Sequence, residues 1–328
     1  EALSGGFMAQ KRLATFKEVP LAFGGAAISG EGGGYGFGSI SQQDSLDLVN
    51  EAFDSGIRVF DSAPIYGFGL SEKRLGKALK GKRDEAFVIS KSGVTWHPNK
   101  RVDMTNDPKV AQSMLEQSLR DLQMDYIDLY MVHWPDEKVD IRQTLEPLAK
   151  AKEQGKILHL GLCNTNRDEI QKAREIDEIE VVQNQFNLFE RDAAELFPFL
   201  QENAISFMGW GTLDKGILTA RVDEKREFER KDCRSWAPWW KQMDKKFKFR
   251  VVKKIRPIVE SHGHTLSEMA LGFSLSYPQV DMALCGAKSS KQLQGLLESL
   301  RNPPKREVFE EIFEEIDEVS QKLRSEDV

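Results

Sequence analysis

The sequence predicts a closed (β/α)8 TIM barrel, and three observations support this fold class. Short apolar runs alternate with longer segments of helical periodicity, which is the pattern of parallel βα units. Eight such pairs fit within the 328 residues, a number typical of a closed barrel rather than an open sheet. Polar residues directly follow several of the runs, at the strand ends where barrels carry their functional groups.

The elements follow one another in a regular order along the chain. The expected strands are residues 21–27, 58–62, 86–90, 126–133, 157–163, 180–185, 205–210 and 282–286. The expected helices between and after them include residues 44–55, 71–79, 109–122, 141–154, 167–176, 193–202, 266–276 and 290–300. Each strand is thus followed by a segment long enough to return the chain to the start of the next parallel strand.

Three segments fall outside the repeat. Residues 11–19 are expected to form an N-terminal hairpin that closes one end of the barrel, and residues 309–323 to form a final amphipathic helix. Residues 213–244 are the longest connection and are expected to form a functional or mobile loop. Because Met8 follows an unusual opening segment, we expect residues 1–7 to be appended or disordered and residues 8–328 to form one domain.

Composition and charge narrow the class of partner. The chain is 40% hydrophobic and 30% charged, with a net charge of -6 and interspersed signs, which indicates a small-molecule partner and favours neither nucleic acid nor a membrane surface. The three cysteines form no C-x-x-C pair, as expected for a reducing cytoplasm. No apolar run approaches the roughly 20 residues that span a bilayer, and the opening residues lack the layout of a signal peptide. Oligomeric state is left open.

Four ionisable residues lie at or just beyond expected strand ends. Asp61 and Tyr66 occur in Phe-Asp-Ser-Ala-Pro-Ile-Tyr-Gly, Lys91 ends Val-Ile-Ser-Lys, and His133 ends Tyr-Met-Val-His. Each residue alone also fits a structural role, as a helix cap, a packed ring or a solvated charge. Because the carboxyl ends of barrel strands meet at one face, the four together predict a catalytic group.

Four short motifs, taken in their order along the chain, resemble the motifs of a known enzyme family. They are Asp61 to Gly67 with Ser71-Glu72 and Leu75-Gly76, then Gly161-Leu162-Cys163-Asn164, then Gln183 in Val-Val-Gln-Asn-Gln-Phe-Asn, then Gly286-Ala287-Lys288-Ser289-Ser290-Lys291. With these motifs the chain resembles an aldo-keto reductase from end to end. The resemblance implies an NAD(P)H-dependent oxidoreductase that transfers a hydride from nicotinamide to the carbonyl of an aldehyde, ketone or sugar, or the reverse.

The resemblance also implies a role for each catalytic residue. Tyr66 is expected to be the general acid that protonates the developing alkoxide. We expect the Lys91 ammonium, held by Asp61, to lower the pKa of the Tyr66 phenol. His133 is expected to donate a hydrogen bond to the substrate oxygen and so polarise the carbonyl.

NADPH is the expected cofactor, with NADH as an alternative. The resemblance places Asn164 and Gln183 on the nicotinamide carboxamide, with Cys163 where relatives carry serine, and Trp210 stacked on the nicotinamide ring. It places Gly211, Thr212, Leu213 and Lys215 along the pyrophosphate. Gly286, Lys288 and Ser289 precede a helix N-terminus and are expected around a 2′-phosphate, although Gln292 stands where many NADP-using relatives carry arginine.

The substrate class is less defined by the sequence. Trp96 and Trp134 follow the third and fourth strands, and their indoles suit aromatic aldehydes as well as sugars. The five histidines are scattered, so we expect no metal. A barrel hydrolase is disfavoured because Asp61 has no second strand-end carboxylate opposite it. A redox sensor that binds the cofactor with little turnover is the alternative function.

Overall fold

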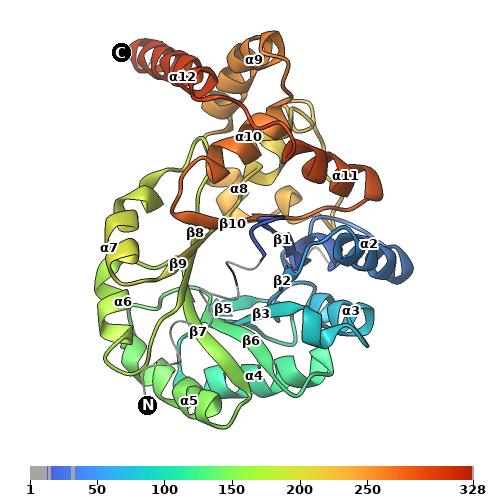
Figure 1. Ribbon diagram of the computed structural model, residues 1–328, viewed down its shortest axis with the longest axis vertical. Coiled ribbons are helices and arrows are strands. Elements are labelled where there is room, and N and C mark those ends of the chain that lie inside the picture. The colour runs from blue at the N-terminus through green and yellow to red at the C-terminus, as the bar shows by residue number, and fades with distance from the viewer. Residues whose placement is uncertain (1–12, 14–15, 31–33, 327–328) are drawn as a thin grey trace.

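The computed structural model describes residues 13, 16–30 and 34–326, and its centre is a closed barrel of eight parallel strands (Figure 1). Around the barrel the strand order is β1, β10, β9, β8, β7, β6, β3, β2. The strands are β1 (Leu21–Gly24), β2 (Val59–Asp61), β3 (Phe87–Ser92), β6 (Ile127–Val132), β7 (Ile157–Cys163), β8 (Val181–Gln185), β9 (Ser206–Trp210) and β10 (Val280–Cys285). The predicted fold class is confirmed.

Strand β1 closes the barrel because it pairs on both sides. Phe23 lies in register with Cys285 of β10 on one side and with Phe60 of β2 on the other. The predicted strand over residues 21–27 was too long, since the chain turns after Gly24 into the short 3-10 helix η1 (Gly25–Ile28). With each barrel strand paired on two sides, no backbone edge of this sheet is left open.

Helices surround the barrel, and most begin at a side chain that caps the first turn. Asp107, Asp140 and Ser289, for example, accept hydrogen bonds from backbone N–H groups in the first turns of the helices that follow them. The helices of the repeat are α2 (Gln42–Asp54), α3 (Leu70–Ala78), α4 (Pro108–Leu122), α5 (Ile141–Glu153), α6 (Arg167–Ala173), α7 (Phe197–Glu202), α10 (Leu266–Leu275) and α11 (Ser290–Ser299). Short 3-10 helices η3 (Arg83–Glu85) and η4 (Asp192–Leu196) precede β3 and α7.

Several segments differ from the sequence prediction. A two-stranded hairpin of β4 (Val94–Trp96) and β5 (Val102–Met104) follows β3, and helix α9 (Lys245–Ser261) follows the long connection. That connection is partly ordered, with η5 (Asp214–Thr219), η6 (Cys233–Ser235) and α8 (Pro238–Gln242). The final helix α12 (Arg306–Glu326) is longer than predicted and packs beside α9 (Figure 1).

The predicted N-terminal hairpin over residues 11–19 falls partly outside the described residues, and residues 1–7 fall outside them entirely. The described part is a turn, in which Phe16 N–H bonds to Leu13 O and Val19 N–H to Phe16 O. Leu13 is fully buried in the cluster inside the barrel, and Phe16 packs edge-on against Phe87 at the first residue of β3. This turn therefore fills the end of the barrel at which the strands begin.

Alternation along the strands decides which side chains enter the barrel. In β3, Phe87 and Ile89 belong to the cluster inside the barrel, whereas Val88 packs in the cluster between the barrel and its helices. The same period places Lys91 on the inward side of β3. In β2, Val59 lies inside and Phe60 outside, so Asp61 also faces inward.

Within the described residues no helix is both long and apolar enough to cross a membrane.

Candidate active site

A buried ion pair joins β2 to β3 at the carboxyl ends of these strands. Lys91 Nζ lies 2.6 Å from both carboxylate oxygens of Asp61 and donates a third hydrogen bond, 3.0 Å long, to Ser62 O. Both residues are only 1% exposed. Burial alone would lower the pKa of Lys91, but the Asp61 carboxylate more than offsets this and raises it. The ammonium is therefore charged and fixed in direction at neutral pH.

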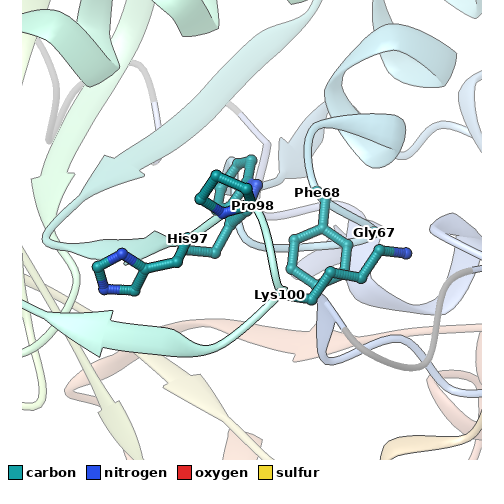
Figure 2. A pocket seen from close by; sticks show the side chains of 6 residues that line it. Gly67, Phe68, His97, Pro98 and Lys100 are labelled. Carbon is teal, nitrogen blue, oxygen red and sulfur yellow. The ribbon is translucent and has the colours of Figure 1, made fainter.

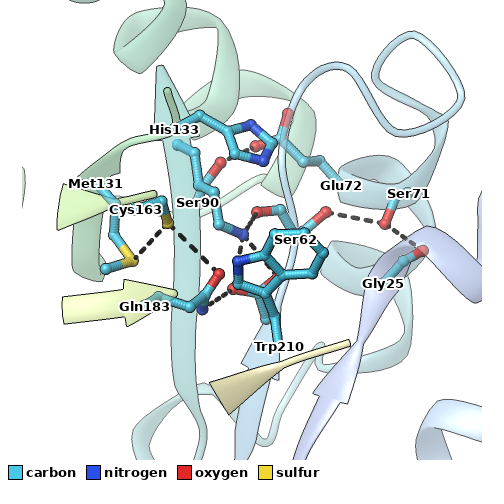
Figure 3. Close-up of polar contacts among 12 residues, drawn as sticks. Gly25, Ser62, Ser71, Glu72, Ser90, Met131, His133, Cys163, Gln183 and Trp210 are labelled. Atoms are coloured by element: carbon cyan, nitrogen blue, oxygen red, sulfur yellow. Dashed lines mark hydrogen bonds and ion pairs between the residues drawn. The ribbon is translucent and has the colours of Figure 1, made fainter. Parts of the chain in front are cut away.

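Gln183 and Cys163 extend this contact set across the barrel (Figure 3). Gln183 Nε2 donates to Asp61 Oδ2 at 2.9 Å, and Gln183 Oε1 accepts a hydrogen bond of 3.4 Å from the Cys163 thiol. Burial raises the pKa of Cys163 to about 12, so the thiol is protonated and can donate. Gln183 is 2% exposed and uses both ends of its amide within the protein, and its binding to the nicotinamide carboxamide stays a prediction.

Tyr66 lies next to the ion pair, on the loop between β2 and α3. Its ring centroid is 5.5 Å from Lys91 Nζ and 5.8 Å from the His133 ring, which meets it edge-on at 88°. The loop is held by Tyr66 N–H bonding to Ala63 O and by Ser71 N–H bonding to Tyr66 O. The structure thus brings together the four residues that the sequence analysis grouped as catalytic.

Lys91 lowers the pKa of Tyr66, as predicted, but the net shift of this pKa is upward rather than downward. Burial raises the pKa of Tyr66 to about 12, and the opposing effect of Lys91 is smaller. Asp61 adds to the upward shift because its carboxylate neutralises the Lys91 ammonium at close range. Lys91 therefore limits the upward shift without reversing it, and Tyr66 stays protonated over the whole neutral range.

His133 faces Tyr66 as a neutral imidazole. Burial and the nearby Lys91 charge hold the pKa of His133 well below its usual value. Its backbone N–H bonds to Ser92 O at 2.9 Å, and its backbone O accepts from Asn164 Nδ2 at 2.8 Å. A neutral imidazole carries one N–H donor, which is what the predicted hydrogen bond to a substrate oxygen requires.

Asn164 follows β7 and connects it by hydrogen bonds to the ends of β6 and β9. Besides its bond to His133 O, its Oδ1 accepts from Trp210 Nε1 at 3.0 Å. The residue has φ of +52°, a left-handed conformation that asparagine tolerates better than most side chains. Trp210 is half-buried and meets Trp134 edge-on at 6.4 Å. The Trp210 ring therefore has a fixed orientation at the end of β9.

The loop after β9 carries the residues predicted along the pyrophosphate, and that role stays a prediction. Thr212 in this loop is fully buried, and its hydroxyl donates to Leu284 O at 3.4 Å. Gly211 and Lys215 both have positive φ, which bends this loop sharply around half-buried Leu213. Lys215 Nζ lies 5.7 Å from the centroid of the Trp210 ring and 5.4 Å from that of the Trp239 ring, so its ammonium contacts both indoles.

A buried charge cluster that the sequence analysis missed anchors this loop. Asp214 is fully buried and binds Lys215 Nζ at 3.3 Å and Lys248 Nζ at 2.9 Å, and Lys248 also reaches Glu190 at 2.9 Å. Lys248 comes from α9, a helix that was not predicted. Val251, Ile255 and Val259, spaced by four and all buried, are the apolar signal that would have found it.

The residues expected to bind the adenosine end of the cofactor lie at the start of α11, beside the loops that carry Phe37 and Glu229. Ser289 caps α11 by accepting a hydrogen bond from Gln292 N–H, and Gln292 Oε1 in turn accepts from Lys288 N–H at 2.8 Å. Gly286 and Ser289 are exposed. Lys288 Nζ donates to Phe37 O at 2.6 Å. Burial lowers the pKa of Lys288, and the nearby Glu229 opposes this.

Aromatic side chains line one side of the barrel mouth, the end at which the carboxyl ends of the strands meet, beside Tyr66. Phe68, Trp96 and Trp134 pack with Tyr66 around a small buried cluster that includes Ile65 and Val94. A hollow of about 420 Å³ opens between the loop that carries Tyr66 and the β4–β5 hairpin (Figure 2). Trp96 lines it directly, whereas Trp134 lies on the other side of the cluster toward Trp210.

Glu72 is a fully buried carboxyl directly behind the ion pair. Its Oε1 accepts from Ser90 Oγ at 2.6 Å, as Figure 3 shows, and Ser90 neighbours Lys91 on the opposite face of β3. Burial raises the pKa of Glu72 to about 7, against two weaker hydrogen bonds from serines and the charge of Lys91.

We expect Glu72→Gln to change how stability depends on pH. The pKa of Glu72 is about 7 in the folded protein, whereas its usual pKa is 4.5. Raising the pH from 4.5 to above 7 therefore lowers the free energy of unfolding of wild type by up to about 3 kcal/mol. The variant has no carboxyl at this position and does not lose this free energy. Urea unfolding of both proteins at pH 5 and pH 8 measures the difference. A stability gap between them that is equal at the two pH values would contradict the assignment.

Within the part of the chain that the structure describes, no three His, Cys, Asp or Glu side chains are grouped to hold a metal ion, and the three cysteines are buried and unpaired.

Comparison with known proteins adds independent information. The model of the aldo/keto reductase family matches residues 20–318. Aldo-keto reductase YhdN of Bacillus subtilis is 34% identical over 270 residues, covering 81% of each chain, and the NADH-specific methylglyoxal reductase of Escherichia coli is 27% identical, covering 78% of this chain and 82% of its own. The solved glycerol dehydrogenase of Gluconobacter oxydans superposes with a TM-score of 0.76 at 28% identity, covering 92% of this chain and 90% of its own.

Proposed function

The chain belongs to the aldo/keto reductase family and is a nicotinamide-dependent carbonyl reductase, and from that premise we propose that Tyr66 is its general acid and NADPH its preferred cofactor. The observation that supports the first part most strongly is the contact set of Tyr66, Lys91, Asp61 and His133. The comparisons give no support to the alternative of a cofactor-binding sensor.

The described residues fit a nicotinamide cofactor. Half-buried Trp210 offers a ring face on which the planar nicotinamide can stack. The Lys215 ammonium lies 5.7 Å from the Trp210 ring and is a cation that can bind the pyrophosphate. The N-terminus of α11 offers backbone N–H groups beside Lys288 and Ser289. When bound, the reduced nicotinamide supplies the hydride that the carbonyl carbon accepts.

The residues of the chain supply everything else in the reaction. The neutral imidazole of His133 orients the substrate oxygen, and the protonated phenol of Tyr66 gives its proton to that oxygen as negative charge develops. The Lys91 ammonium stabilises the phenolate that is left, because an opposite charge nearby favours the ionised form. Asp61 keeps this ammonium charged and holds it 5.5 Å from the centre of the Tyr66 ring.

A cationic group at the adenosine end supports NADPH over NADH. A 2′-phosphate adds charge that Lys288 and Lys291 can neutralise together with the α11 N-terminus, whereas NADH has an uncharged hydroxyl there. The unpaired buried cysteines support a further proposal, that the protein works in a reducing cytoplasm.

We expect Lys288→Met to raise the Kd of NADPH about 10-fold and that of NADH less than two-fold, since a charge-assisted hydrogen bond to phosphate is worth about 1.5 kcal/mol. Fluorescence titration with both nucleotides measures this difference, with Lys109→Met, on the exposed start of α4, as the control. An equal loss of affinity for the two cofactors would show that Lys288 only supports the local structure.

The reaction itself is tested with purified protein and NADPH at 340 nm against a panel of aldehydes, ketones and aldoses. Turnover of at least one carbonyl class is expected. Tight NADPH binding without turnover of any member would favour the sensor instead.

A further inference from the structure

Two lysines share one buried carboxylate beside Trp210, in the loop where the cofactor pyrophosphate is predicted to bind. Asp214 is fully buried, and its Oδ1 lies 3.3 Å from Lys215 Nζ, whereas its Oδ2 lies 2.9 Å from Lys248 Nζ. Lys248 belongs to α9, which packs against η5, the segment that carries Asp214 and Lys215. A helix that is remote in the sequence therefore competes with Lys215 for the carboxylate of its neighbour.

Asp214 does not serve the two lysines equally. Lys248 makes the shorter contact with it and also lies 2.9 Å from a second carboxylate, that of Glu190. Burial acts to lower the pKa of Lys248, but Asp214 and Glu190 outweigh it and raise this pKa. The pKa of Lys215 is lowered instead, because burial and the Lys248 ammonium together outweigh Asp214. Asp214 therefore neutralises Lys248 more than it neutralises Lys215.

The aromatic neighbours of Lys215 hold its ammonium without neutralising it. The rings of Trp210 and Trp239 have their centroids 5.7 Å and 5.4 Å from Lys215 Nζ. The face of an indole attracts a cation through its quadrupole but carries no net charge. The Lys215 side chain also keeps 12% of its surface exposed. Its ammonium is therefore oriented beside the two rings and can still bind an anion.

We propose that Lys248 is a positioning residue for the cofactor: it binds Asp214 and so leaves the Lys215 ammonium available to the pyrophosphate of the dinucleotide. The formal charges of the two lysines cancel those of Asp214 and Glu190. Without Lys248 these groups would carry a net negative charge, and Asp214 would pair with Lys215 alone. Both changes disfavour an anion beside Trp210. The proposal rests on the proposed function, because it concerns the binding of the same cofactor.

Lys248→Met is the central test, with Lys253→Met, at an exposed position of the same helix, as the matched control. Fluorescence titration should show the Kd of NADPH and that of NADH each rising about 10-fold, because both nucleotides carry the pyrophosphate. This result differs from that expected for Lys288→Met, which should affect NADPH far more than NADH. Lys253→Met should change neither Kd more than about two-fold, and Lys248→Arg, which keeps a cation, should stay within about three-fold of wild type.

Two further variants separate the charge of Lys248 from its packing. Glu190→Gln removes a side chain that is 43% exposed and leaves Lys248 to Asp214, so the Kd of both nucleotides should fall about three-fold. Asp214→Asn combined with Lys248→Met leaves no carboxylate on Lys215. Both Kd values of this double variant should return to within about three-fold of wild type.

The outcomes distinguish this proposal from the proposed function. If Lys248→Met leaves both Kd values unchanged, or if the double variant binds as weakly as Lys248→Met, Lys248 does not act through the charge of Asp214 and the proposal is overturned. A loss of affinity confined to NADPH would also overturn it. Should Lys248→Met fail to fold, Glu190→Gln decides, since unchanged or weaker binding of both nucleotides would contradict the proposal. In each of these cases carbonyl reduction by wild type with NADPH keeps the proposed function, whereas a wild type that binds neither nucleotide would end both.

Discussion

Tyr66→Phe is expected to lower kcat for carbonyl reduction by two or more orders of magnitude, which corresponds to about 2.7 kcal/mol or more in the transition state. The reason is chemical: phenylalanine keeps the ring that meets His133 edge-on and packs against the cluster of Ile65 and Val94, but it removes the proton that the developing alkoxide needs. The measurement is steady-state reduction at 340 nm, beside a fluorescence titration with NADPH.

The titration is the internal control for that variant. Because Tyr66 touches the substrate oxygen in our mechanism, the Kd of NADPH should change less than three-fold. Reduction by Tyr66→Phe at the wild-type rate would show that the proton comes from another donor.

The second large effect is expected for Lys91→Met, which should lose both activity and stability. Removing the ammonium leaves the Asp61 carboxylate 1% exposed with Gln183 as its remaining side-chain partner, and an unpaired buried charge costs about 3–5 kcal/mol. Without Lys91 the pKa of Tyr66 also loses the effect that lowers it, so the phenolate left after proton transfer is less stable. We expect kcat to fall by at least two orders of magnitude, measured beside urea unfolding.

A double variant separates the two losses. Asp61→Asn with Lys91→Met removes the unpaired charge and should recover most of the unfolding free energy, because a buried ion pair and its neutral replacement are often similar in stability. Activity should stay as low as in Lys91→Met. Recovery of both properties together would mean that Lys91 only supports the fold.

The sequence predicted the positions of the catalytic residues better than their electrostatics. Asp61, Lys91 and His133 could be placed because each ends an apolar run, and parallel strands of a barrel end at one face. The pKa of Tyr66 could not be predicted from such spacing. It depends on how deeply the loop buries the ring and on how closely Asp61 neutralises Lys91, and both are properties of the folded chain.

Side-chain partners are a second property that the sequence could not predict. The Gln183 amide bonds to Asp61 and Cys163 and the Thr212 hydroxyl to Leu284 O, while the cofactor roles of both residues stay predictions. A strand register tells which face a residue takes, whereas these contacts depend on rotamers in a packed interior. The β4–β5 hairpin escaped prediction because its strands are short and only partly buried, so they lack the apolar run that marks a barrel strand.

Titration of the Tyr66 phenol by ¹³C NMR tests the central claim most directly. The chain has five tyrosines, so the Cζ signal of Tyr66 is assigned by its loss in Tyr66→Phe. We predict a pKa of about 12 in wild type, a lower value in Asp61→Asn, where the ammonium is no longer neutralised, and a higher value in the double variant that lacks both charges. A Tyr66 that titrates near 10 in all three proteins would contradict the coupling between this phenol and Lys91.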